Sequence, residues 1–255
     1  MRPALWRWLG RVPFAETART QERLREAVVL GEGAETLLLC EHEPVITLGR
    51  SARAAHVLLS PGELERRGVS LLAASRGGDV TYHGPGQLVG YPVVRLRGGV
   101  LGHVTAMARA VARVLAELGV DAVWRRETPG LWVGEAKICA FGVHVRHRVT
   151  NHGFALNVGA NLDGFDLIIP CGLTGTRTTS IARVLGAGAT APALHVLASR
   201  VAAAFGDEIG VEMLPAIDRA ADRAADDDVA TQSATRSIAM KPIEKSDGIT
   251  RMIGA

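Results

Sequence analysis

Cys171 stands between Pro170 and Gly172, a setting typical of a turn. Glycine beside the sulfur would let a backbone N–H approach an oxyanion that forms there. The two other cysteines, Cys40 and Cys139, are embedded in apolar stretches, where a free cysteine is usually a small buried hydrophobe. Cys171 is therefore the candidate nucleophile.

A nucleophilic cysteine needs a base or a cation beside it, because a thiol of ordinary pKa, about 8.5, is only a few per cent thiolate at neutral pH. The candidate partners are Lys137, His83, His144 and His152, and their spacing leaves a Cys/His pair as open as a Cys/Lys pair. A desolvated ammonium can lose its proton and act as a base.

Lys137 is the only lysine in the first 240 residues, and 26 of the 29 basic residues are arginines. A compositional bias toward arginine explains this ratio, because it would replace lysine wherever any positive charge suffices. The position that kept lysine is then a candidate for a role that needs an amine. The alternative is the chance survival of a surface lysine. Lys137 begins an apolar stretch that predicts a strand, and the pleat of a regular strand would place it on the same face as Cys139.

Residues 76–87 combine four glycines with Arg, Asp, Tyr, His and Gln side chains. Glycines let a backbone approach a ligand closely, so this density of polar groups favours the wall of a binding site over a plain hairpin with a polar turn. The stretch matches neither the GxGxxG nor the GxxxxGK[ST] pattern, so it does not predict a phosphate loop.

Hydrophobic periodicity and turn residues predict alternating helices and strands around these motifs. The predicted helices cover residues 16–30, 62–67, 104–118, 180–185 and 192–205. The predicted strands cover residues 37–40, 45–48, 69–73, 80–82, 88–94, 120–124, 131–133, 137–145 and 151–158. This interleaving indicates an α/β or α+β fold. From residue 216 the sequence loses its periodicity, which predicts one domain over 1–215 and a mostly disordered tail over 216–255.

The 255-residue composition excludes several classes of protein. A hydrophobic share of 47% excludes a disordered chain, and a net charge of only +3 disfavours a dedicated nucleic-acid binder. No uncharged apolar run reaches the roughly 20 residues that a membrane span requires. Three unpaired cysteines and the lack of CxxC or HxxxH spacing argue against disulfides and metal sites, so we expect a cytoplasmic protein without a metal.

Several motifs in order resemble the lipoyl(octanoyl) transferases. The matching stretches are Leu5–Gly10, Glu43–Arg50, Arg76–Gln87, Gly134–Gly142, Asn151–Asn157 and Ile169–Gly172, so the resemblance runs from about residue 3 to 210. It implies a mixed β-sheet flanked by helices around an acyl-chain cavity, as in the catalytic domains of biotin and lipoate protein ligases.

The resemblance also implies an activity. Members of this family move an octanoyl group from octanoyl-acyl carrier protein to a lysine on lipoyl domains of 2-oxoacid dehydrogenase complexes and on the glycine cleavage H protein. Cys171 would carry the acyl group as a thioester and Lys137 would be its acid/base partner. Because the acyl group arrives activated, neither ATP nor a metal is expected, and no nucleic acid or membrane partner is expected.

The residues implied to bind substrate are Arg76, Gly77, Gly78, Asp79, Val80, Thr81, Tyr82, His83, Ala140, Phe141, Gly142, Gly153, Phe154 and Ala155. The family pattern leads us to expect serine or another small residue at position 140, so alanine removes one hydroxyl there. Arginines that would suit docking of an acidic carrier are Arg125, Arg126, Arg146 and Arg148, although a solvated charged face is the better explanation for any one of them.

Three other functions compete with the transferase hypothesis. An ATP-dependent lipoate ligase would share the fold but activate a free acid as an adenylate, without a cysteine intermediate. A non-catalytic module would bind acyl carriers or lipoyl domains without turnover. A thioesterase would release free octanoate without an acceptor.

Overall fold

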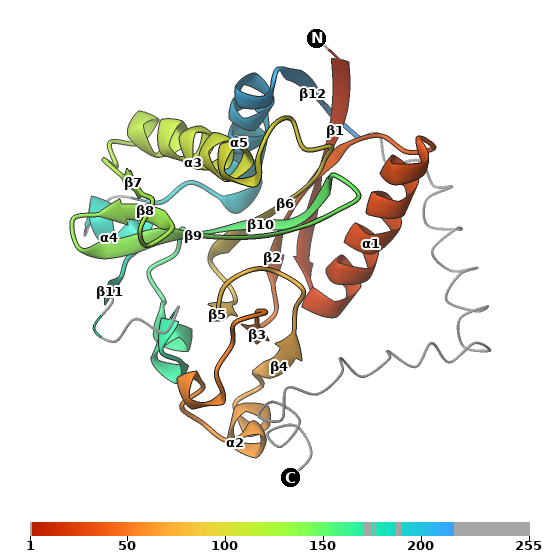
Figure 1. Ribbon diagram of the computed structural model, residues 1–255. Coiled ribbons are helices and arrows are strands. Elements are labelled where there is room, and N and C mark those ends of the chain that lie inside the picture. Colours follow the sequence, from red (N-terminus) through yellow and green to blue (C-terminus); the bar gives the residue numbers. More distant parts are fainter. Residues whose placement is uncertain (1, 171–174, 176, 187–189, 217–255) are drawn as a thin grey trace, which may run out of the picture.

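The computed structural model describes residues 2–170, 175, 177–186 and 190–216 (Figure 1). Cys171 and the predicted tail from residue 217 onward therefore lie outside the described residues.

A mixed sheet of nine strands forms the centre of the protein. Its order is β12 (Val211–Pro215), β1 (Arg2–Val12), β2 (Thr36–His42), β6 (Gln87–Val93), β10 (Val149–Asn157), β9 (Ala136–Arg146), β8 (Gly130–Val133) and β7 (Val123–Arg125), with β11 (Arg177–Thr178) also paired to β9. The pairs β12–β1, β1–β2 and β11–β9 are parallel, and the other pairs are antiparallel.

Three further strands make a second, smaller sheet in the order β4 (Ser70–Ala73), β3 (Val45–Leu48) and β5 (Val80–His83). Strand β5 pairs with β3, whereas β6 pairs with β2 and β10. The glycine-rich turn at residues 84–86 therefore carries the chain from one sheet to the other, which excludes a simple hairpin at this point.

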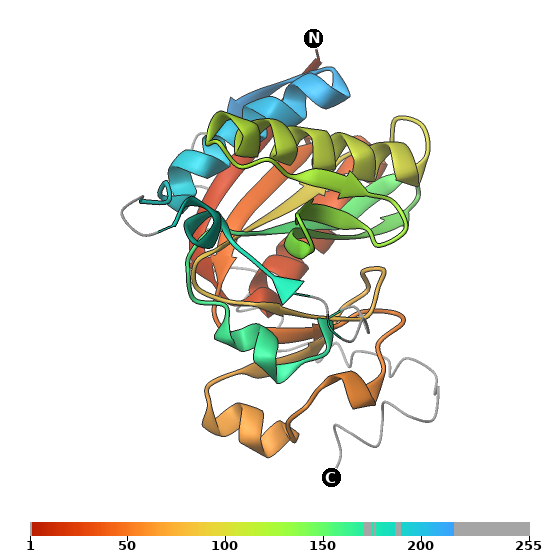
Figure 2. The same ribbon diagram turned by 90° about the vertical axis from the view of Figure 1, so that its left-hand side faces the viewer.

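Helices cover both faces of the large sheet. Helices α3 (Val100–Glu117) and α5 (Leu194–Ile209) lie together on one face, and α1 (Phe14–Leu30) packs on the other (Figures 1 and 2). The pleat of β2 shows the division, because Leu37 and Leu39 enter the core under α3 and α5, while Leu38 and Cys40 pack with Phe14 of α1.

The short elements lie at different places around these layers. Helix α2 (Pro61–Arg66) accompanies the small sheet at the bottom of Figure 1, α4 (Ile181–Leu185) begins after Ser180 and packs Ile181 into the core under α3 and α5, and two 3₁₀ turns cover Ala54–His56 and Asp163–Leu167. No helix within the described ranges is long and apolar enough to span a membrane.

The predicted fold class is confirmed, and the long helices fall within a few residues of their predicted positions. Strands β1, β11 and β12 were not predicted, and β7 begins three residues later than its predicted strand. The separate small sheet of β3, β4 and β5 was not predicted.

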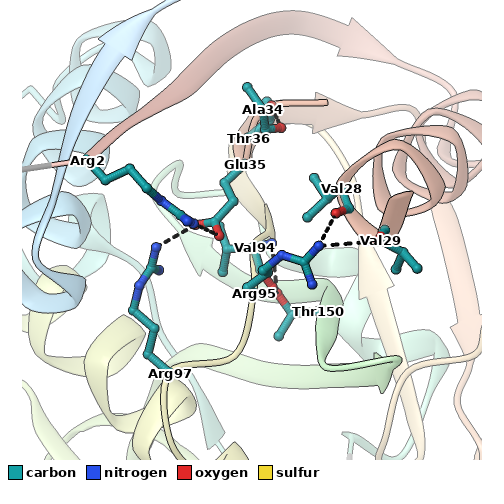
Figure 3. Close-up of polar contacts among 10 residues, drawn as sticks. All are labelled: Arg2, Val28, Val29, Ala34, Glu35, Thr36, Val94, Arg95, Arg97 and Thr150. Carbon is teal, nitrogen blue, oxygen red and sulfur yellow. Dashed lines mark hydrogen bonds and ion pairs between the residues drawn. The ribbon is translucent and has the colours of Figure 1, made fainter. Parts of the chain in front are cut away.

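A buried carboxylate ties strand β1 of the large sheet to the loop before α3. Glu35 is 6% exposed and pairs with Arg2 on β1 and with Arg97, whose guanidinium nitrogen is 2.7 Å from the carboxylate (Figure 3). Beside this cluster, Arg95 donates to the carbonyl oxygens of Val28 (2.5 Å) and Val29 (3.2 Å), at the end of α1. A cation there complements the negative end of the helix dipole.

We expect Glu35→Gln to lower the free energy of unfolding by about 1–2 kcal/mol, because both arginines lose a charged hydrogen-bond acceptor. Urea denaturation measures the effect. The matched control is Glu117→Gln, which breaks the exposed pair with Arg200 and should cost about 0.5 kcal/mol or less. Equal losses in the two variants would contradict a structural role for Glu35.

Candidate active site

Lys137 lies near the start of β9 and is 7% exposed. Its Nζ lies 4.9 Å from the centroid of the Trp132 ring and 3.4 Å from the carbonyl oxygen of Pro129. Gly130 makes room for this side chain, because a Cβ there would lie 2.9 Å from Cε of Lys137. A cation–π contact and a carbonyl acceptor thus orient the amine inside the protein.

A register shift between β8 and β9 changes the face on which Lys137 lies. Gly130 and Leu131 pair with Ala140 and Cys139, but Trp132 pairs with Lys137, so one extra residue of β9 is accommodated as a bulge. Cys139 therefore enters the core under α3 and α5, whereas Lys137 lines a cavity with Ala140. The prediction that Lys137 and Cys139 share a face was wrong, because it assumed an uninterrupted pleat.

We call the space around this amine the lysine cavity. Its lining residues are Thr81, Gln87, Lys137, Ala140, Ala155, Asn157, Phe165, Pro170 and Thr178. Pro170 directly precedes Cys171, so the described chain brings the neighbour of the predicted nucleophile into the same cavity as the predicted base.

We call a second space the inner cavity. It lies between the large sheet on one side and, on the other, strand β5 and the loop of residues 76–79 that precedes this strand. Thirteen of the fourteen residues predicted to bind substrate line it, namely Arg76, Gly77, Gly78, Asp79, Val80, Thr81, His83, Ala140, Phe141, Gly142, Gly153, Phe154 and Ala155. The inner cavity and the lysine cavity share the walls Thr81, Ala140 and Ala155. That these residues bind substrate remains a prediction.

Tyr82 is the predicted residue that does not line either cavity. Its ring packs edge-on against Phe165, with centroids 5.7 Å apart, as the alternation of side chains along β5 requires. Four lining residues were not predicted: Phe14, Val89, Tyr91 and His152. His152 was named only as a possible base, and the other three carry no signal beyond hydrophobic periodicity.

The loop before β5 is held by its own polar residues. Arg76 is 8% exposed and donates to the Thr47 carbonyl oxygen (2.6 Å) and hydroxyl (2.9 Å) on β3. The Asp79 carboxylate pairs with His56 and accepts the backbone N–H of Val80 at 2.8 Å. These contacts give Arg76 and Asp79 a structural role in shaping the cavity wall.

Close backbone packing accounts for one of the glycines. The Gly77 N–H donates to the Val143 carbonyl oxygen at 3.0 Å, so the loop lies directly on β9. A Cβ at Gly142 would lie 3.1 Å from the carbonyl oxygen of Gly77. Glycine at position 142 therefore lets the loop and the sheet enclose the inner cavity.

A directional chain of hydrogen bonds connects the two cavities. Asn157 donates to the Thr179 carbonyl oxygen (3.0 Å), so its side-chain oxygen must accept from Gln87 Nε2 (2.9 Å). The Gln87 oxygen then accepts from Nδ1 of His83 (2.7 Å), which leaves the lone pair of this imidazole on Nε2. Thr179 in turn donates its N–H to the Lys137 carbonyl oxygen at 2.9 Å, so the chain ends at the amine's own strand.

Burial disfavours charge on the histidines of the inner cavity. It lowers the pKa of His83 to about 3, with a smaller contribution from His42, and it lowers the pKa of His152 to about 3, with a smaller contribution from Arg76. Both imidazoles are therefore neutral and weakly basic at pH 7. Burial also lowers the pKa of His144, which lines neither cavity. Of the four candidate bases, Lys137 is the one that lines the lysine cavity, and its role as base remains a prediction.

An open depression, the outer groove, leads from the surface to Lys137. It shares Gly77, Gly78, Asp79, Phe141 and Gly142 with the inner cavity. Its other side comes from the start of α3 and the loop before β8, and it is lined there by Val100, Leu101, Val104, Trp124, Arg126, Glu127, Thr128 and Pro129. The amine thus lies where the outer groove meets the lysine cavity.

The two described cysteines play no visible part in this site, and no metal centre accompanies it. Burial raises the pKa of the thiols of Cys40 and Cys139, as expected for buried hydrophobes. Across the part of the chain that the structure describes, no three His, Cys, Asp or Glu residues gather in a way that could hold a metal ion.

Solved structures of lipoate protein ligases share this fold. A bipartite lipoate protein ligase from Thermoplasma acidophilum superposes with a TM-score of 0.64, covering 91% of this chain and 93% of that one at 16% identity. This likeness concerns the fold alone.

Sequence comparison identifies the family. Residues 13–206 match the model of the lipoyl protein ligase A/B catalytic domain. An octanoyltransferase of Chloroflexus aurantiacus is 44% identical over 218 residues, which cover 83% of this chain and 96% of the relative. An octanoyltransferase of Solibacter usitatus is 43% identical over 224 residues, which cover 87% of this chain and all of the relative. The chain belongs to the lipoyl protein ligase A/B catalytic domain family, and the family resemblance of its motifs is confirmed.

We expect acid to destabilise the protein through its buried histidines. The pKa values of His83 and His152 are about 3 and that of His103 is about 4 in the folded protein, against about 6.5 when unfolded. Unfolding therefore takes up protons, so stability is full above pH 6.5 and is lost as the pH falls toward the folded values. The loss at pH 5 is up to about 2 kcal/mol per histidine.

Urea denaturation at several values of pH between 8 and 5 measures this loss. His103 lies on α3 against Phe205, outside the cavities, so His103→Gln removes one titrating group without touching them. This variant should lose stability less steeply below pH 6.5. An unchanged slope would exclude His103 as a source of the acid sensitivity.

Proposed function

We propose that this protein transfers an octanoyl group from a carrier thioester to a lysine of a lipoyl domain. The observation that carries the proposal is the position of Lys137, which lies where the outer groove meets the lysine cavity and shares that cavity with Pro170, the neighbour of Cys171. The names of relatives at 43–44% identity over nearly their whole length support it.

In the first half-reaction, Cys171 attacks the thioester carbonyl while Lys137 takes the thiol proton. A new S–C bond forms, the bond to the carrier sulfur breaks, and Lys137 returns the proton to the leaving thiolate. In the second half-reaction, the amine of the target lysine attacks the acyl-cysteine. The C–S bond breaks, an amide forms, and the amine proton passes through Lys137, so that Cys171 regains a thiol.

The shape of the cavities matches this sequence of events. The inner cavity would hold the alkyl chain, because its walls include Val80, Val89 and Phe154. The outer groove is the route by which a carrier arm or a target lysine would reach the amine. Use of this opening by each substrate in turn would fit two half-reactions joined by an acyl-enzyme.

The donor would be octanoyl-acyl carrier protein, and the acceptors would be lipoyl domains of 2-oxoacid dehydrogenase complexes and the glycine cleavage H protein. Among the arginines suggested for docking, Arg126 lines the outer groove, whereas Arg125 pairs with Glu135 and Arg148 donates to the carbonyl oxygen of Leu96. Arg126 is therefore the best placed for contact with an acidic carrier.

The catalytic unit would comprise residues 1–215, with the tail as an appendage, since β12 ends at Pro215. A free nucleophilic thiol is most durable in a reducing compartment, so we place the reaction in the cytoplasm. An ATP-dependent ligase remains the rival for the same fold, and acylation in the absence of ATP separates the two.

Incubation with octanoyl carrier alone, without ATP or acceptor, should yield a stoichiometric octanoyl adduct on Cys171, as shown by mass spectrometry of the intact chain and its peptides. Cys171→Ala should carry no adduct, whereas Cys40→Ala should still be acylated because that thiol is buried. A chain that stays unmodified until ATP and free acid are added would favour the ligase. Release of free octanoate without an acceptor would favour a thioesterase, and binding without chemistry would favour a non-catalytic module.

We expect Lys137→Arg to lower the rate of transfer by roughly 10²–10⁴-fold, because a guanidinium keeps the charge but does not exchange its proton. Rapid-quench measurement of adduct formation and of its transfer to a lipoyl domain would report each half-reaction. Arg113→Lys is the matched control, since Arg113 pairs with Asp207 between α3 and α5, outside the cavities, and it should leave both rates unchanged. Full activity of Lys137→Arg would refute the assignment of the base.

A further inference from the structure

Three stacked rings line the inner cavity. The ring of Phe14 lies nearly parallel to that of His83, with centroids 6.1 Å apart at 9°, and to that of His152, at 6.4 Å and 11°. Each of the three residues is 5% exposed. None of them lines the lysine cavity or the outer groove, but His83 is bonded to Gln87, which lines the lysine cavity. Phe14 packs with Leu38 and Cys40 under α1, so it is the ring of the three that we place at the end away from Lys137.

We propose that Phe14 is the stop that limits the length of the acyl chain this protein accepts. The inference rests on the proposed function, and it adds the residue that sets substrate specificity. An alkyl chain whose carbonyl carbon lies beside Lys137 extends past Thr81 and Ala155, and it meets the face of helix α1 where that helix begins.

A hydrogen-bonded polar group borders the Phe14 ring and opposes its displacement. His42 contacts its edge, with centroids 5.6 Å apart. Nδ1 of His42 donates to the Val12 carbonyl oxygen at 2.8 Å, so Nε2 accepts from the Tyr91 hydroxyl at 2.7 Å. A longer chain that pushed the ring backward would leave buried polar groups without partners, which is costly.

Hydrogen bonds hold α1, the helix that begins at Phe14, at its middle and at its end. In its middle, Gln21 accepts the backbone N–H of His152 at 2.7 Å, and this histidine has a left-handed φ of 55°. At its end, Arg95 holds the carbonyl oxygens of Val28 and Val29 (Figure 3). These contacts hold α1 in place, so the Phe14 ring could move only by rotation of its own side chain, which His42 opposes.

Burial of one methylene group changes affinity by roughly fourfold. A rigid stop therefore discriminates chains that differ by two carbons by about one order of magnitude, because the longer chain leaves two methylenes outside the cavity or displaces the ring. Replacement of the ring by a smaller side chain should shift this limit toward longer chains.

The test is a competition among hexanoyl, octanoyl, decanoyl and dodecanoyl carriers, with kcat/KM compared within one preparation of the full chain. These ratios do not depend on the fraction of folded enzyme. In Phe14→Leu we expect the decanoyl-to-octanoyl ratio to rise by about tenfold. In the matched control Phe205→Leu, which removes a similarly buried ring from α5, the ratio should equal that of the unmodified chain.

A second variant works in the opposite direction. Val89 lines the same end of the cavity from β6, so Val89→Ile adds one methyl group there and should raise the hexanoyl-to-octanoyl ratio. If the unmodified chain transfers octanoyl groups but Phe14→Leu keeps its chain-length profile, the proposal is overturned. If the unmodified chain transfers no acyl group from any carrier, the proposed function itself has failed.

Discussion

The bulge between β8 and β9 is the constraint on which the candidate site depends. A regular pleat would direct Lys137 with Cys139 into the core beneath α3 and α5, where an ammonium would have to be buried among aliphatic side chains. One extra residue in β9 turns the amine to the other face, beside Ala140 and Ala155. Bulges often re-aim a side chain next to an active site, and here the register shift decides whether the amine of Lys137 reaches the cavity.

The cavities exist because two sheets face each other without filling the space between them. The loop of residues 76–79 lies directly on β9, and Thr47 of the small sheet accepts a hydrogen bond from the Arg76 guanidinium. The buried polar groups here bond to other protein groups, which fixes the geometry of the cavity walls. The chain from Asn157 through Gln87 to His83 is directional, because a backbone carbonyl at one end determines the orientation of each later group.

The sequence predicted the residues in the walls of the site better than it predicted the buried end of the inner cavity or the pairing of the strands. Glycine-rich and polar motifs identify the walls, because close backbone approach and polar side chains leave a signal in residue type. The buried end of the inner cavity left no such signal in the sequence, since Phe14, Val89 and Tyr91 look like ordinary core residues of a helix and a strand. The bulge in β9 and the separation of β5 from β6 depend on pairing with strands elsewhere in the chain, which local periodicity does not reveal.

The contrast between arginine and lysine in this chain now has a physical basis. Arg76 bonds to several oxygens at once, as a planar guanidinium with five donors can, and its place is structural. Lys137 fits a narrow space, where its Cε and Cδ occupy the volume that a side chain at Gly130 would need, and its nitrogen faces a ring and a carbonyl oxygen. A guanidinium in that space would have to bury a larger polar group with more donors to satisfy. Packing and proton chemistry thus favour the same residue, and a bias toward arginine elsewhere does not extend to this position.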